Sequence, residues 1–248
     1  MSVRAFHPPG PWAAGHRLTL DGEESHYLLR VRRIRPGSAL ELLDGQAARW
    51  HARLVEHKGR RAVVELLQPL GSVTVLPLEL LLVMPEPRAT LESITHACEL
   101  GATAIWLVKG DHSAGAVPSP ERIAKTIAAA QRQCGRPTPP AVHGPLSLTQ
   151  ALASTAHRPG HVAQIPDRHH ATPVLVDPGL GARLLVGPEG GLSPPEQAAA
   201  AGAGLRPLSL GPWVLRAPTA VSAGLARLQG ATSSSDPLTN EAPSRADP

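Results

Sequence analysis

The chain has 248 residues, 42% of them hydrophobic and 18% charged, which suits a globular protein of one or two domains. We find no signal peptide and no apolar run long enough to span a membrane. The two cysteines, Cys98 and Cys134, do not suggest a disulfide framework, so we expect a cytoplasmic protein. The twelve histidines are scattered without the spacing of metal ligands, so we expect no metal site.

Positive charge is concentrated in the first part of the chain. Residues 1–70 contain eleven Lys or Arg against seven Asp or Glu, an excess of four, whereas residues 71–248 contain thirteen of each. This distribution indicates a basic N-terminal module that holds an anionic partner, beside a neutral remainder that performs the chemistry.

The N-terminal module is predicted to be a small β-barrel. Strand candidates at 39–45, 48–56 and 62–67 are separated by turn residues such as Asp44-Gly45, and this spacing is typical of small all-β domains. A short helix is expected over 26–33. Arg30, Arg32, Arg33 and Arg35 follow one another densely enough to contact phosphates as a group, although each one alone is more simply a solvated charge.

Strands and helices alternate after a linker at 71–77. This alternation predicts a mostly parallel, layered α/β domain. The strands are expected at 78–84, 102–108 and 161–165, and the helices at 88–100, 121–133 and 146–155.

Two strand–turn–helix units follow each other near the end of this domain. In the first, Leu184-Leu185-Val186 leads into the turn Gly187-Pro188-Glu189-Gly190-Gly191, and Ser193 and Glu196 then form a predicted capping box. In the second, 208–211 leads into 212–216 and a helix over about 219–229. The first unit alone could be an ordinary βα turn, but two such loops can face each other across one pocket. Beyond Gly230 the sequence is polar and rich in Ser and Pro, which predicts a disordered tail.

The order GPEGG, S-x-x-E and LG-x-x-VLR-x-x-TA resembles the RsmE family of SPOUT methyltransferases. Glu99-Leu100-Gly101 and Gln133-Cys134-Gly135-Arg136 match further family motifs, and 26–45 resembles the PUA-like RNA-binding domain that begins these proteins. Members of this family methylate N3 of a uridine in 16S ribosomal RNA of the small subunit, using S-adenosylmethionine. The resemblance implies an α/β fold: a SPOUT-type parallel sheet with a C-terminal trefoil knot over residues 73–230, after a PUA-like β-barrel domain over 1–72 and before the tail at 231–248. It also implies a homodimer with each site near the subunit interface.

The resemblance also implies the functional residues. Glycine turns let backbone groups grip the adenine and ribose of the cofactor, although the apolar positions could equally be core. The cofactor residues are expected to be Ile165, Pro166, Leu185, Val186, Gly187, Glu189, Gly190, Gly191, Leu210, Gly211, Val214, Leu215 and Ala220. Arg216 is expected to stabilise the uracil anion or a phosphate, and Glu189 to act as a base or to cap a helix or the ribose. Arg30, Arg32, Arg33, Arg35 and Arg136 are the expected RNA contacts.

The sequence departs from the family pattern at four positions. Pro218 replaces a glutamate, His96 and His112 stand where basic residues are usual, and a Lys- or Arg-rich helix start is reduced to Arg88. Two alternatives therefore stay open: a non-catalytic RNA-binding or ribosome-assembly protein, and a SPOUT enzyme with another RNA target. A Rossmann dehydrogenase is disfavoured, because no G-x-G-x-x-G follows an early strand. The particular uridine, the choice between naked RNA and assembled subunit, and the proton acceptor are not determined by the sequence.

Overall fold

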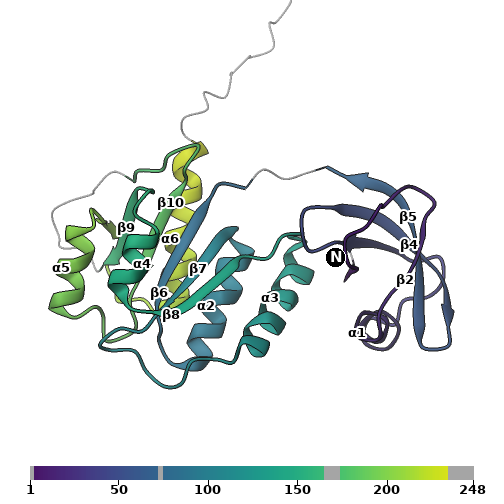
Figure 1. Ribbon diagram of the computed structural model, residues 1–248, viewed down its shortest axis with the longest axis horizontal. Helices are drawn as coiled ribbons and strands as arrows, with labels where there is room; N and C mark the ends of the chain where they lie inside the picture. The colour runs from purple at the N-terminus through teal and green to yellow at the C-terminus, as the bar shows by residue number, and fades with distance from the viewer. Residues whose placement is uncertain (1–2, 72–74, 165–173, 234–248) are drawn as a thin grey trace, which may run out of the picture.

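The structure, a computed structural model, describes residues 3–71, 75–164 and 174–233. Its strands form two sheets, one of five strands in the N-terminal part and one of six strands in the rest (Figure 1). The first sheet ends at Leu70 and the second begins at Leu78, on either side of the predicted boundary between the two domains. Among the described residues no helix is both long and apolar enough to cross a membrane.

The N-terminal module is built on a five-stranded sheet. Its strands are β1 (Arg4–Phe6), β2 (Arg17–Thr19), β3 (Ala39–Leu43), β4 (Arg49–Lys58) and β5 (Arg61–Leu70), in the order β1-β3-β4-β5-β2. All pairs are antiparallel except β1 with β3. The three predicted strands are confirmed, whereas the short strands β1 and β2 carry too little pattern to be predicted.

The helix expected at 26–33 begins earlier than predicted. It starts as α1 (Gly22–His26) and continues as the π-helix η1 (Tyr27–Val31). The Asp21 side chain accepts a hydrogen bond from the Glu24 backbone N–H at 2.8 Å, so the helix is capped at Asp21. Leu28 lies fully buried beneath the sheet, which explains why this segment packs here.

The second sheet is entirely parallel, whereas the alternating pattern predicted a mostly parallel one. Its strands are β6 (Leu78–Val83), β7 (Ala102–Val108), β8 (Ala141–Leu146), β9 (Gly160–Gln164), β10 (Ala182–Val186) and β11 (Arg206–Ser209), in the order β11-β9-β10-β6-β7-β8. The central strands β6 and β10 are buried along their whole length, because helices cover both faces.

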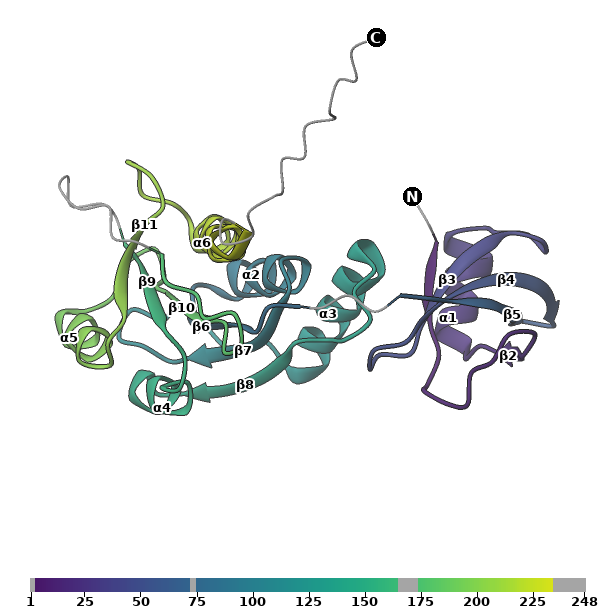
Figure 2. The same cartoon turned by 90° about the horizontal axis from the view of Figure 1, so that it is seen from above.

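Five helices cover this sheet. They are α2 (Pro87–Glu99), α3 (Pro120–Cys134), α4 (Leu148–Ser154), α5 (Pro194–Gly202) and α6 (Ala217–Ser233). Helices α2, α3 and α6 lie on one face and α4 and α5 on the other (Figure 2). Side chains therefore alternate between two cores along β10: Leu184 and Val186 face the α2 and α6 side, and Leu185 faces α4 and α5.

Two boundaries differ from the sequence prediction. The helix expected at 146–155 begins only at Leu148, because 141–146 form the edge strand β8. That strand pairs with β7 alone, is largely exposed and contains Gly144 and Pro145, so it has no apolar run to reveal it. At the other end, α6 extends to Ser233, three residues into the predicted tail; residues 234–248 lie outside the described residues. The knot stays a prediction.

The two modules meet at the C-terminal end of α3. Arg132 pairs with the buried carboxylate of Glu24, and its guanidinium lies 5.2 Å from the centres of the Phe6 and Tyr27 rings. Arg4 of β1 donates to the backbone oxygen of Arg132 at 3.0 Å. The partly buried Arg132 guanidinium, held between two rings and a carboxylate, therefore stabilises the contact between the two modules.

One buried charge on β10 joins the helices of the second face. The Arg183 guanidinium donates to Leu152 O at 2.7 Å, to Thr155 Oγ1 at 2.9 Å and to Ala203 O at 2.8 Å. The two carbonyls belong to the C-terminal ends of α4 and α5, where helices lack internal donors and favour a cation.

We expect Arg183→Met to lower the free energy of unfolding by about 2 kcal/mol or more, because methionine fills the space but leaves buried carbonyls without donors. Urea denaturation measures this change. The control is Arg206→Met, which removes an exposed arginine of the neighbouring edge strand β11 and should leave the midpoint nearly unchanged. Equal midpoints for the two variants would contradict the role given to Arg183.

Candidate functional site

The glycine turn begins where the buried strand β10 ends. Gly191 N–H donates to Pro188 O at 2.8 Å and closes the turn. Gly191 has φ 72°, in the left-handed region that favours glycine. A Cβ on Gly187 would lie 3.3 Å from the Leu192 side chain, so this position also has little room. The backbone of the turn is thus exposed at the carboxyl edge of the sheet.

The predicted capping box is confirmed at the start of α5. Ser193 Oγ accepts from Glu196 N–H at 3.4 Å, and Glu196 Oε2 accepts from Ser193 N–H at 2.8 Å. The second oxygen of this buried carboxylate accepts from Asp111 N–H at 3.0 Å, and Ser193 Oγ donates to Asp111 Oδ2 at 2.5 Å. His112 Nδ1 lies 3.1 Å from Gly191 O. The loop after β7 therefore holds the glycine turn in place.

The second predicted loop joins β11 to α6. Gly211 has φ 125°, another left-handed conformation that suits glycine. Helix α6 begins at Ala217, and Glu189 Oε1 accepts from Ala217 N–H at 3.5 Å. Of the roles considered for Glu189, the structure shows the helix cap, which also places a carboxylate at the positive end of α6.

A cavity of about 360 Å³ lies between the two loops. This volume is within the range of small-molecule pockets. Its walls combine apolar side chains with backbone of the glycine turn and with one carboxylate. Eight of the residues predicted to contact a cofactor line it: Val186, Gly187, Glu189, Gly191, Leu210, Val214, Leu215 and Ala220.

Four other predicted residues do not line this cavity. Leu185 is fully buried and faces α4 and α5, because strand side chains alternate. Gly190 lies against His112, where a Cβ would be 3.3 Å from the His112 Cβ. Gly211 shapes its loop from outside the cavity wall, and Arg216 is exposed immediately after Leu215. The remaining two predicted residues, Ile165 and Pro166, lie outside the described residues.

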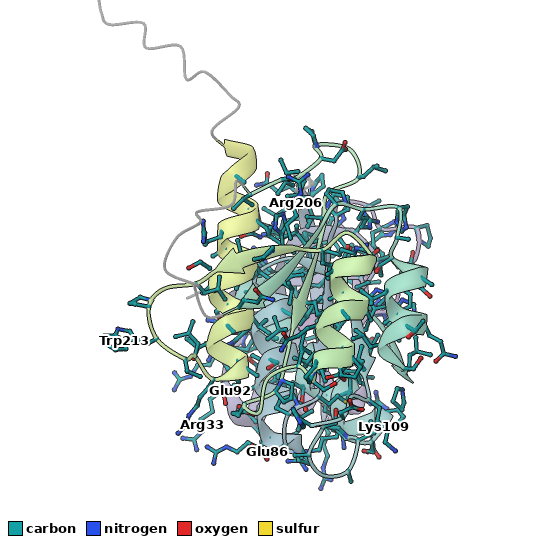
Figure 3. The ribbon with its side chains drawn as sticks, turned by 90° about the vertical axis from the view of Figure 1, so that its left-hand side faces the viewer. Arg33, Glu86, Glu92, Lys109, Arg206 and Trp213 are labelled. Carbon is teal, nitrogen blue, oxygen red and sulfur yellow. The ribbon has the colours of Figure 1, made fainter. Side chains whose placement is uncertain are left out.

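The cavity also has lining residues that sequence reasoning missed. They are Ala163, Gln164, Pro188, Leu192, Gln197 and Trp213. Ala163 and Gln164 end β9, next to β10, so a stricter use of the rule that parallel strands end at one edge would have found them. Trp213 is 77% exposed and stands out from its loop (Figure 3). Within the described ranges, no three His, Cys, Asp or Glu residues gather as potential metal ligands.

Comparison with known proteins agrees with these two modules. The family model described as "RNA methyltransferase domain" matches residues 74–229, and "RNA methyltransferase PUA domain" matches 20–67. Ribosomal RNA small subunit methyltransferase E of Synechocystis is 31% identical over 222 residues, which are 85% of this chain and 72% of the relative. The chain belongs to the RsmE family of RNA methyltransferases. The RsmE protein of Mycobacterium bovis is 32% identical over 224 residues, with 85% of each chain covered.

Two solved structures share the architecture of most of this chain. A Legionella pneumophila methyltransferase structure with bound S-adenosylmethionine is 26% identical and has a TM-score of 0.78, covering 93% of this chain and 98% of that one. The RsmE structure of Neisseria gonorrhoeae, also bound to S-adenosylmethionine, is 25% identical with the same TM-score and coverage.

Two departures from the RsmE pattern lie together in the fold. His96 Nδ1 of α2 is 3.1 Å from Pro218 O and 2.9 Å from Ser222 Oγ, both in α6. His96 therefore joins two helices. Pro218 occupies the first turn of α6, where a missing backbone N–H costs nothing, and the N–H that Glu189 caps belongs to Ala217.

The predicted RNA-binding arginines divide into groups. Arg30 and Arg35 line a second hollow on the N-terminal module, whereas Arg32 and Arg33 do not. Arg136 is half-buried and donates to Cys98 O at 3.1 Å, and burial lowers its pKa. The Arg136 guanidinium thus ties the end of α3 to α2, and its expected contact with RNA stays a prediction.

Cys98 and Cys134 lie against each other beside Arg136. The hydrogen bond from the Cys98 thiol lowers the pKa of Cys134 to about 6, assisted by the Arg136 backbone N–H, whereas that bond and burial raise the pKa of Cys98. We expect iodoacetamide to alkylate Cys134 with a rate that rises as pH increases through about 6 and then levels off, since the thiolate is the nucleophile.

Mass spectrometry of the folded protein would follow this alkylation. Buried Cys98 should stay unlabelled, and Cys134→Ser should abolish labelling. A rate that rises only near pH 9 would show that the Cys98 thiol does not stabilise the Cys134 thiolate.

Proposed function

We propose that this protein methylates N3 of a uridine in 16S ribosomal RNA, with S-adenosylmethionine as methyl donor. The observation that carries the proposal is the cavity bounded by both RsmE loop motifs at the carboxyl edge of the parallel sheet. The Neisseria and Legionella structures hold S-adenosylmethionine, and the Synechocystis and Mycobacterium relatives carry the name of a small-subunit ribosomal RNA methyltransferase.

The lining residues fit this cofactor. Leu210, Leu215 and Ala220 offer an apolar wall suited to the faces of an adenine ring. The glycine turn exposes backbone N–H and C=O groups for the polar edges of adenine and ribose. The Glu189 carboxylate lines the same cavity, and a negative group there favours a positively charged sulfonium over a neutral ligand.

When bound, the cofactor supplies an electrophilic methyl group: its S–CH3 bond breaks as the N3–CH3 bond forms, and the sulfur keeps the electron pair. The protein must hold uracil N3 in line with that bond and accept the N3 proton. Arg216 is our candidate for stabilising the uracil anion. Its exposed side chain follows directly on the cavity wall, and none of the described carboxylates forms an ion pair with it.

The uridine must leave its stack to reach such a cavity. The basic N-terminal module is our candidate for holding the surrounding RNA. We further expect a homodimer with each site near the subunit interface, and a cytoplasmic location where ribosomal RNA is modified. Light scattering on the purified protein measures the first of these.

Incubation of the protein with S-adenosylmethionine and either naked 16S RNA or small subunits that lack the modification tests the proposal. Nucleoside mass spectrometry should detect 3-methyluridine. A different methylated nucleoside would favour a retargeted enzyme. A folded protein that binds RNA but produces no methylated nucleoside on either substrate would favour the non-catalytic alternative.

A further inference from the structure

A second hollow, of about 860 Å³, lies on the N-terminal module, far from the glycine turn in the sequence. Two segments form it: the helical segment with its following turn, at 22–36, and the tip of the β4–β5 hairpin, at 57–61. We call it the basic hollow. Its cationic and histidine lining consists of His26, Arg30, Arg35, His57, Arg60 and Arg61, and its apolar lining of Leu29, Ile34 and Pro36.

The charges of the basic hollow are not neutralised. None of its lining residues is acidic. Arg30, Arg35 and Arg60 are exposed and form no ion pair with any carboxylate in the described part of the chain. Arg61 donates only to a neutral carbonyl, Leu20 O, at 3.2 Å. Four arginines around one concave surface produce a positive potential that attracts a polyanion.

The hollow divides the arginine cluster of the sequence. Arg32 and Arg33 belong to the same short run as Arg30 and Arg35, yet they lie outside its lining. Within this run, Arg33 has a left-handed backbone with φ 52°. The hairpin tip supplies Arg60 and Arg61 instead, from the segment between the strands predicted at 48–56 and 62–67.

We infer that the basic hollow binds the sugar-phosphate backbone of single-stranded RNA, with one base against Leu29, Ile34 and Pro36. This inference rests on the proposed function in taking RNA as the substrate. A concave site with apolar side chains in its lining can admit a base that has left its stack, and guanidinium planes can stack on that base. A duplex keeps its bases paired and stacked, so none of its bases can contact these apolar side chains. The hollow would thus hold RNA that flanks the target uridine.

The test compares two variants of the full chain that each remove two positive charges: Arg30→Gln with Arg60→Gln, and Arg32→Gln with Arg33→Gln. Fluorescence anisotropy measures binding of a short fluorescein-labelled oligouridine across a range of salt concentrations. We expect the first variant to bind about ten-fold more weakly. Its salt slope should fall by about 1.4, since each phosphate contact on a single strand contributes about 0.7. The second variant should bind like the wild type.

Equal weakening by both variants would overturn the inference, because net charge alone would then explain binding. The inference would also be overturned if the Arg30→Gln, Arg60→Gln variant bound oligouridine with wild-type affinity. It would be overturned as well if the wild type bound oligouridine no more tightly than a duplex of the same length. Unfolding midpoints and S-adenosylmethionine calorimetry verify that each variant is intact. If the wild type binds RNA through the basic hollow but never methylates it, the proposed function is wrong and the inference about the hollow holds. If the Arg30→Gln, Arg60→Gln variant binds RNA like the wild type and the protein methylates RNA fully, the proposed function holds and the inference about the hollow is wrong.

Discussion

Ala220→Phe is expected to weaken S-adenosylmethionine binding by at least about 100-fold while the protein stays folded. Ala220 lies in α6 and its side chain borders the cavity between the two loops. A phenyl ring there would occupy space that the cofactor needs, because Ala220 lines the cavity of about 360 Å³. Isothermal titration calorimetry measures the dissociation constant.

Ala226→Phe is the matched control, because Ala226 lies on the exposed side of the same helix. It should bind the cofactor like the wild type. If Ala220→Phe also bound normally, with an unchanged unfolding midpoint, the cofactor would have to lie elsewhere. Oligouridine binding should survive in both variants, since the basic hollow lies on the other module.

Arg216→Ala should lower kcat by about 100- to 1,000-fold and leave S-adenosylmethionine affinity almost unchanged. This is the usual cost of removing one group that stabilises developing negative charge. The side chain is exposed and does not border the cavity, so its loss should not disturb the cofactor. Single-turnover methylation of small subunits, with both substrates saturating, measures the rate.

Arg216→Lys separates the charge from the planar guanidinium and should recover part of the rate. Arg206→Ala removes another exposed arginine, on β11, and should keep wild-type kcat. A loss that appears only in KM for RNA would assign Arg216 to RNA binding and contradict its proposed part in the methyl-transfer step.

Local signals in the sequence predicted the parts of the site that depend on neighbouring residues. The apolar run before Gly187 predicted β10, and the spacing of Ser193 and Glu196 predicted the capping box of α5. Both follow from short-range hydrogen bonding and burial, which do not need the rest of the fold. The two glycine loops face each other across one cavity, as expected from parallel strands that end at a common edge.

Other features arise from contacts between distant segments. Glu189 caps α6, and His96 joins α2 to Pro218, because helix α6 packs beside α2 and next to the glycine turn. The Arg136 side chain donates to Cys98 O, a contact between α3 and α2 that its motif alone did not reveal. Leu185 faces away from the cavity through the alternation of β10.

The sequence by itself determined the alternation of strands and helices in the second domain, the family, the two loops that border the cavity and the basic character of the first module. These properties are encoded in periodicity, turn residues and motif spacing. Only the tertiary structure decided which arginines share a surface, since Arg60 joins Arg30 through the β4–β5 hairpin and Arg32 does not. Side chains far apart in the sequence share a surface only when tertiary packing brings them together. No local sequence pattern specifies the distance between them in space.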